Sequence, residues 1–165
     1  MYAKMLEIGE MHFDEPEIAF ARKLQQSFPA GSLEYSYAQL QRATLGGFSR
    51  EDLINPLWTK VLQHSLNAPV MPGSTEVGDV SYITPTGQLT TCCWPLGAPG
   101  HSWQITASSG SSIGFKGMLF AAKALALSAL DLLTKPELLQ AAKAEFTVST
   151  GGKKYVSPIP EGTVP

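Results

Sequence analysis

The strongest constraint on the fold is a long apolar run over residues 117–133. Its side chains are apolar except at Lys123, Ser128 and Asp131. Two charges inside the run, and a length below the roughly 20 apolar residues that span a bilayer, argue against a transmembrane helix. We therefore expect a buried helix that starts after Ser112 and is covered on most faces. One side of it would carry Ile113, Met118, Ala122, Leu125, Ala129 and Leu132.

Composition limits the class of partner. A chain of 165 residues can form one domain with a real core. Its net charge of −2 gives nucleic acid or an anionic membrane no electrostatic reason to bind, so neither partner is expected. Charged residues make up 16%, below the roughly 25% usual for a globular domain. Part of the surface is therefore expected to face other protein.

The two cysteines, Cys92 and Cys93, are adjacent in the chain. Neighbouring side chains of a strand point to opposite faces, so we interpret both as reduced core residues rather than a disulfide or a metal pair. The N-terminus lacks the basic and apolar pattern of a signal peptide, which predicts a cytoplasmic protein.

Capping patterns predict several helices. Residues 1–8 are helix-like but start without a capping residue, whereas Asp14, Pro16 and Glu17 form a clear helix start. A weak helix is expected over 33–42, capped by Ser32, and a short one that runs through Ser81, capped by Ser74 or Thr75. A final helix over 135–146 is followed by Gly151 and Gly152, and residues 157–165 are expected to form an extended tail.

One buried strand is expected over residues 89–94, with a Gly- and Pro-rich loop carrying His101 and Trp103 behind it. Strand, loop and long helix in this order predict an α/β fold, in which such loops hold the functional groups.

Each candidate residue also has a purely structural interpretation. His101 has the chemistry of a metal ligand or base, but a lone loop histidine is usually structural, and His12 and His64 are interpreted as surface residues. Glu76 and Asp79 form either a carboxylate pair or acids at a helix start. Ser112 lies in a turn that could hold an anion at a helix N-terminus or simply cap that helix.

Four segments together carry a resemblance to a known family: GSTEVGDVSYITPT, CCWPLGAPGHSWQ, SSIGFKGMLFAAK and GGKKYVSPIP. They resemble the C-terminal part of the B subunits of p-aminobenzoyl-glutamate hydrolases, within the zinc amidohydrolase and carboxypeptidase family that includes auxin-conjugate hydrolases. The resemblance covers nearly the whole chain and is densest over residues 73–160. Relatives usually have Asp at the position of Glu76 and His at that of Phe115.

The resemblance implies a helix-rich part of an αβα sandwich, the catalytic domain of zinc exopeptidases. In that family an inserted lid splits the domain, and two metal ions are held by His, Asp and Glu. Most of these ligands and the general base precede the lid, so residues 1–165 are expected to be one domain lacking the lid and the N-terminal metal-binding half. His101 matches the last metal ligand, while Glu76, Asp79, Trp103 and Ser112 are expected near the substrate pocket.

The leading hypothesis is the C-terminal segment of a metal-dependent amidohydrolase that cleaves an acyl- or aroyl-amino acid such as p-aminobenzoyl-glutamate. We expect no catalytic residue in this chain, no activity, and no zinc or other divalent metal bound by it alone, because one imidazole binds zinc weakly. The expected partners are the missing N-terminal half or a separate chain, with self-association through uncovered apolar surface. The alternative is a non-catalytic α/β interaction or ligand-binding module derived from that fold.

Overall fold

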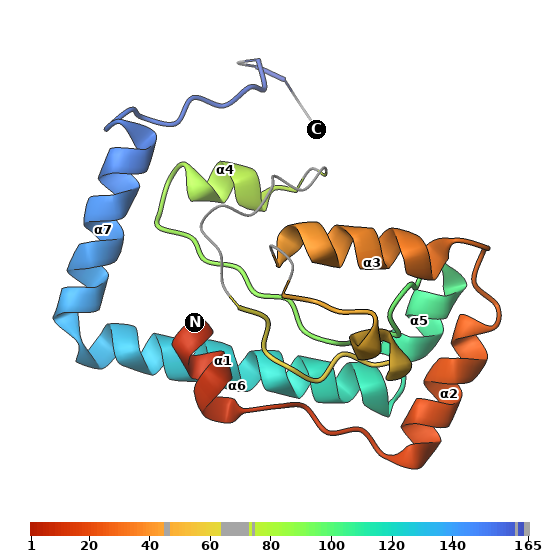
Figure 1. The fold of residues 1–165 in the computed structure, drawn as a ribbon. Helices are drawn as coiled ribbons and strands as arrows, with labels where there is room; N and C mark the ends of the chain where they lie inside the picture. Colours follow the sequence, from red (N-terminus) through yellow and green to blue (C-terminus); the bar gives the residue numbers. More distant parts are fainter. Residues whose placement is uncertain (45–46, 64–72, 74, 161, 164–165) are drawn as a thin grey trace. The chain divides into compact units, whose positions relative to one another are not determined.

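The fold consists of helices joined by irregular segments (Figure 1). The computed structural model describes residues 1–44, 47–63, 73, 75–160 and 162–163. The predictions for His64 and Ser74, and the last residues of the predicted tail, lie outside these residues. Within them the helices are α1 (Tyr2–Ile8), α2 (Glu15–Gln25), α3 (Ser32–Ala43), the 3-10 helix η1 (Glu51–Ile54), α4 (Val77–Ser81), α5 (Trp103–Ser109), α6 (Ser112–Thr134) and α7 (Pro136–Thr150).

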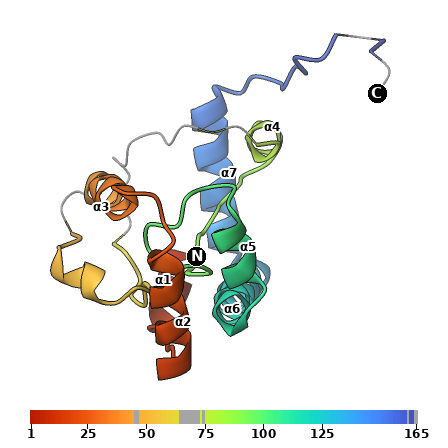
Figure 2. The same ribbon diagram turned by 90° about the vertical axis from the view of Figure 1, so that its right-hand side faces the viewer.

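The predicted α/β fold is wrong for this structure, because no residue that it describes is in a strand. The ribbon carries no arrow in Figure 1 or Figure 2. The expected strand at 89–94 is an irregular segment that lies against helices: Thr91 Oγ1 donates to the Gly117 carbonyl at 3.0 Å, and Ser108 Oγ donates to the Cys93 carbonyl at 3.1 Å. A strand needs a neighbouring strand for its backbone groups, and the described chain offers none.

The predicted capping residues agree with the observed helix ends better than the predicted strand agrees with the structure. Asp14 and Glu17 form the predicted capping box of α2, with each side chain accepting a hydrogen bond from the other's backbone N–H. Gly31 is the N-cap of α3, so Ser32 is the first helical residue rather than the cap. Helix α7 runs four residues past the predicted end at residue 146 and ends at Gly151, whose φ is 60°.

The chain divides into two compact units. Unit 1 comprises Met1–Val70 and Leu89–Leu127, and unit 2 comprises Met71–Gln88 and Ser128–Pro165. In unit 1, Ala21 of α2, Leu57 and Ile113 of α6 form a buried cluster. Phe13, Phe20 and Cys92 pack against this cluster. The first half of α6 is therefore a core element of unit 1.

Gly117 sets how closely α6 approaches the segment before it. A Cβ added to Gly117 would lie 2.5 Å from the Cys92 carbonyl oxygen and 2.5 Å from Cys93 Sγ. Both distances are far below van der Waals contact, so only glycine allows this packing.

The expectation that α6 is buried on most faces is wrong. Its buried residues are Ile113, Gly114, Gly117, Phe120 and Ala124. Of the predicted stripe only Ile113 is buried, whereas Met118, Leu125 and Leu132 are exposed. By length and composition α6 could cross a membrane, with 17% of its most apolar stretch buried.

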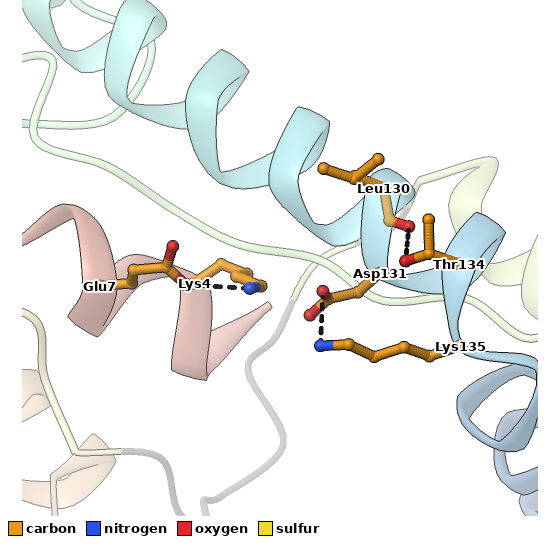
Figure 3. Close-up of polar contacts among 6 residues, drawn as sticks. All are labelled: Lys4, Glu7, Leu130, Asp131, Thr134 and Lys135. Carbon is orange, nitrogen blue, oxygen red and sulfur yellow. Dashed lines mark hydrogen bonds and ion pairs between the residues drawn. The ribbon is translucent and has the colours of Figure 1, made fainter.

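Local polar contacts close the ends of two helices, as Figure 3 shows. In unit 1, Lys4 of α1 pairs with Glu7 at 2.9 Å. In unit 2, Thr134 Oγ1 donates to the Leu130 carbonyl at 2.7 Å, and Lys135 pairs with Asp131 at 2.8 Å. Exposed ion pairs of this kind add only about 0.3–0.5 kcal/mol each to the free energy of unfolding, so they stabilise the helices locally and do not determine the fold.

The close approach at Gly117 predicts opposite effects for two Gly→Ala substitutions. G117A should lower the free energy of unfolding by about 1–3 kcal/mol, because the new methyl group meets backbone in a packed core. G78A in α4 should raise it by up to about 1 kcal/mol, because nothing lies within 4 Å of the added Cβ and alanine favours helix. Urea unfolding followed by circular dichroism measures both. Equal effects of the two substitutions would contradict the packing at Gly117.

Candidate functional site

The loop that carries His101 is anchored to unit 1 on both sides. Gln25 of α2 donates to the Leu96 carbonyl at 2.9 Å, and the Leu96 N–H donates to the Pro56 carbonyl at 2.8 Å. After the loop, the buried Gln104 donates to the Ser27 carbonyl at 3.2 Å. The loop is therefore held against the C-terminal end of α2, which fixes where His101 is presented.

Sequence reasoning missed helix α5, which begins only two residues after His101. The signal was present in Ser102, which is the N-cap and accepts a hydrogen bond from the Ile105 N–H at 3.4 Å. Figures 1 and 2 show α5 beside the first turns of α6. The segment 89–102 thus leads into two adjacent helices, α5 and α6, and is not a strand followed by a loop at the edge of a sheet.

His101 has an unusual backbone conformation. Its φ is 55°, and among the described residues it is the non-glycine residue with positive φ. L-residues in this left-handed region are strained by about 1–2 kcal/mol. The side chain is exposed, so burial does not offset this cost. Such strain is common at functional positions, and the metal role of His101 stays a prediction.

The other predicted pocket residues of unit 1 lie at helix starts. Trp103 is the first residue of α5 and its side chain is 62% exposed. Ser112 is the first residue of α6 and lines a cavity of about 230 Å³. The cavity is also lined by Asp14, Pro16, Glu17, Phe20 and Ile113, and neither His101 nor Trp103 contributes to it. The structure therefore does not bring Ser112 and His101 together in one cavity.

A partly buried ion pair that the sequence did not predict lies beside this cavity. Lys116 Nζ of α6 contacts Glu17 Oε2 of α2 at 2.6 Å, and the Glu17 side chain is 6% exposed. Burial raises the pKa of Glu17, but the Lys116 ammonium and hydrogen bonds from Ser112 and the Asp14 backbone outweigh it and lower the pKa. The pair is separated by 99 positions in sequence, so no local pattern signals it.

Glu76 and Asp79 belong to unit 2. Glu76 is the N-cap of α4 and Asp79 lies within that helix, and both side chains are exposed. Tyr155 Oη donates to Asp79 Oδ1 at 2.7 Å, which raises the pKa of Tyr155. The ring of Tyr155 stacks on that of Tyr82 with centroids 6.3 Å apart. Asp79 is thus engaged by the segment after α7.

The donor groups of the described residues do not by themselves fit a catalytic metal. No group of three or more His, Cys, Asp and Glu that could hold a metal ion occurs among them. A catalytic zinc needs about three protein ligands, and His101 supplies one. Burial raises the pKa of the Cys92 thiol to about 11, so it stays protonated near neutral pH and is a poor ligand.

Comparison with known proteins confirms the predicted resemblance. The chain is 31% identical over 170 residues to the B subunit of p-aminobenzoyl-glutamate hydrolase from Escherichia coli (strain K12), a match that covers 100% of the chain and 35% of the relative. Human Xaa-Arg dipeptidase is 35% identical over 94 residues, 57% of the chain and 21% of the relative. The mouse Xaa-Arg dipeptidase is 40% identical over 81 residues, 49% of the chain and 18% of the relative.

The chain thus spans about a third of the length of the E. coli relative. No family model matches it, and no solved structure matches it. The relationship to hydrolases therefore rests on sequence similarity along the whole chain.

The Glu17–Lys116 pair predicts a specific loss of stability. K116M should lower the free energy of unfolding at neutral pH by about 1–3 kcal/mol, because it leaves a buried carboxylate without its counter-charge. K123M is the matched control: Lys123 is exposed on the same helix, and the expected change is within about 0.5 kcal/mol.

The same pair predicts how this loss depends on pH. The lowered pKa of Glu17 means that its contribution is complete above the ordinary carboxyl pKa of about 4.3 and is lost as the pH falls through the lower folded value. The difference between wild type and K116M should therefore shrink in acid. A difference that grows on acidification would contradict the pair.

The strain at His101 predicts that glycine is favoured there. H101G should have a free energy of unfolding about 1 kcal/mol above that of H101A, because glycine adopts a positive φ without a Cβ clash. Inside α5, where the backbone is helical, A107G should instead destabilise by about 1 kcal/mol. Chemical denaturation of the three variants checks the sign, and an H101A more stable than H101G would exclude the strained conformation.

Proposed function

We propose, from the premise that this chain is homologous over its whole length to the B subunit of p-aminobenzoyl-glutamate hydrolase, that it is the C-terminal segment of a metal-dependent amidohydrolase. The reaction is cleavage of the amide bond of an acyl- or aroyl-amino acid such as p-aminobenzoyl-glutamate. The observation that carries the proposal is a match that covers 100% of this chain and only 35% of the relative. Similarity to two Xaa-Arg dipeptidases, which are also hydrolases by name, supports the reaction class.

In this proposal the chain supplies part of a site and other polypeptide supplies the rest. His101 contributes one imidazole from an anchored, exposed loop, and Trp103 presents an exposed aromatic face two residues further on. Aromatic faces of this kind suit an aroyl group. The described residues do not complete a metal site, so we assign no catalytic step to them.

The alternative is a non-catalytic interaction or ligand-binding module. It is equally compatible with the donor groups of the described residues, which form no metal-binding group by themselves. The two functions differ in what they predict when the remainder of a hydrolase is supplied.

The test uses the E. coli relative in which the matched segment is replaced by this 165-residue chain. We expect the isolated chain to leave p-aminobenzoyl-glutamate intact in the presence of Zn²⁺ or Mn²⁺, and the chimera to cleave it. H101A should lower the activity of the chimera by at least about 100-fold, since it removes a metal ligand. H12A, which removes another exposed histidine, should have little effect.

Two results would decide against the proposal. Metal-dependent cleavage by the isolated chain would show that it holds a complete site. A folded chimera without activity would favour the non-catalytic module.

A further inference from the structure

Helix α6 carries a continuous apolar face whose side chains remain exposed in the described chain. Its residues recur at spacings of three and four, so they lie on one side of the helix. We call this the outer face of α6. It consists of Phe115, Met118, Leu119, Ala122, Leu125 and Ala126, all of them exposed and all in unit 1. The four large side chains are each between 51% and 58% exposed.

The opposite side of the same helix is already in use. Ile113, Phe120 and Ala124 are buried, and Gly117 lies against Cys92 and Cys93. Lys116 is tied to Glu17 of α2 by the 2.6 Å ion pair. These contacts fix the rotation of α6 within unit 1, so the outer face stays at the surface.

A helix with large apolar side chains on both its inner and its outer side is normally enclosed, either in a protein core or in a membrane. Insertion into a bilayer would require the inner side to give up the Glu17–Lys116 pair and the contact at Gly117. It would also place Lys123, which borders the outer face, in hydrocarbon. The contacts of unit 1 therefore argue for a protein cover.

We infer that the outer face of α6 packs against polypeptide corresponding to the part of the hydrolase relative that lies outside the match. This inference rests on the proposed function. The match includes α6 but covers only 35% of the relative, so most of that protein has no counterpart in this chain. A second copy of this chain would correspond to the same third of the relative, and it would supply none of the relative's other two thirds. The partner surface must itself be apolar, since a face without charge or hydrogen-bonding groups offers only packing.

Cysteine labelling in the chimera described above tests this directly. M118C lies on the outer face, and Q26C, at the exposed end of α2, is the control. We expect the thiol of M118C to react with maleimide at least about tenfold more slowly in the chimera than in the isolated chain, whereas Q26C reacts at similar rates in both. The unsubstituted proteins give the background from Cys92 and Cys93.

The outcomes separate this inference from the proposed function. A chimera that cleaves substrate while M118C stays fully reactive would overturn the inference alone. Protection of M118C in an inactive chimera would support the inference and count against the function. Protection in the isolated chain that rises with its concentration, or on addition of phosphatidylcholine–phosphatidylglycerol vesicles, would assign the face to a second copy or to a membrane and would overturn the inference.

A second pair of variants needs only the isolated chain. L119Q on the outer face should leave the denaturation midpoint unchanged and increase the soluble yield, because Leu119 is uncovered. F120Q, one position further and buried, should lower the midpoint. A loss for L119Q as large as that for F120Q would show that the outer face already packs within this chain, which would overturn the inference.

Discussion

The structure depends on one helix, α6, which carries apolar side chains on two opposite sides and is buried along only one of them. Burial of apolar surface is the main favourable term in folding, at about 25 cal/mol for each Å² removed from water. The inner side of α6 gains this energy against α2 and the segment at residues 91–93, with Ile113 fully buried and Gly117 allowing close approach. The outer face gains less of it, since its four large side chains remain between 51% and 58% exposed. Unit 1 is thus packed on one side of its central helix and exposed on the other.

The Glu17–Lys116 pair fixes how α2 and α6 are positioned against each other. Hydrophobic contact alone lets a helix rotate or slide, whereas a buried carboxylate needs its donors at fixed positions. Glu17 accepts hydrogen bonds both from the start of its own helix and from Lys116, so the N-terminal turn of α2 is locked to the first turns of α6. A loop anchored to α2 then presents His101 on the same unit. The candidate ligand and the uncovered helix face consequently belong to one compact body.

The sequence predicted those features that neighbouring residues determine. The capping box at Asp14 and Glu17 follows from local hydrogen bonding, and the structure has it. The start of α6 was predicted to within one residue, whereas α7 runs four residues beyond its predicted end to reach Gly151. The strand over residues 89–94 failed because β-branched composition describes a side-chain environment, and a strand also needs a partner. The Lys116 partner of Glu17 and the exposure of Met118 and Leu125 depend on tertiary contacts, which periodicity does not encode.

The site was predictable only in part for the same reason. His101 stands out in the sequence, and the structure adds its positive φ. Ser102 was not singled out, and the structure shows that it caps α5. Glu76 and Asp79 fall in unit 2, where Tyr155 engages Asp79. The relative is about three times as long as the match, so in the proposed function the other metal donors belong to polypeptide outside this chain.

The central claim is that α6 is an interior helix of a larger hydrolase body. Hydrogen–deuterium exchange of peptides covering residues 115–126, compared between the isolated chain and the E. coli relative carrying this chain, tests it most directly. The account predicts that exchange in these peptides slows by at least about tenfold in the larger protein, because opening the helix must then break contacts on both sides. Equal exchange rates in the two proteins would contradict it.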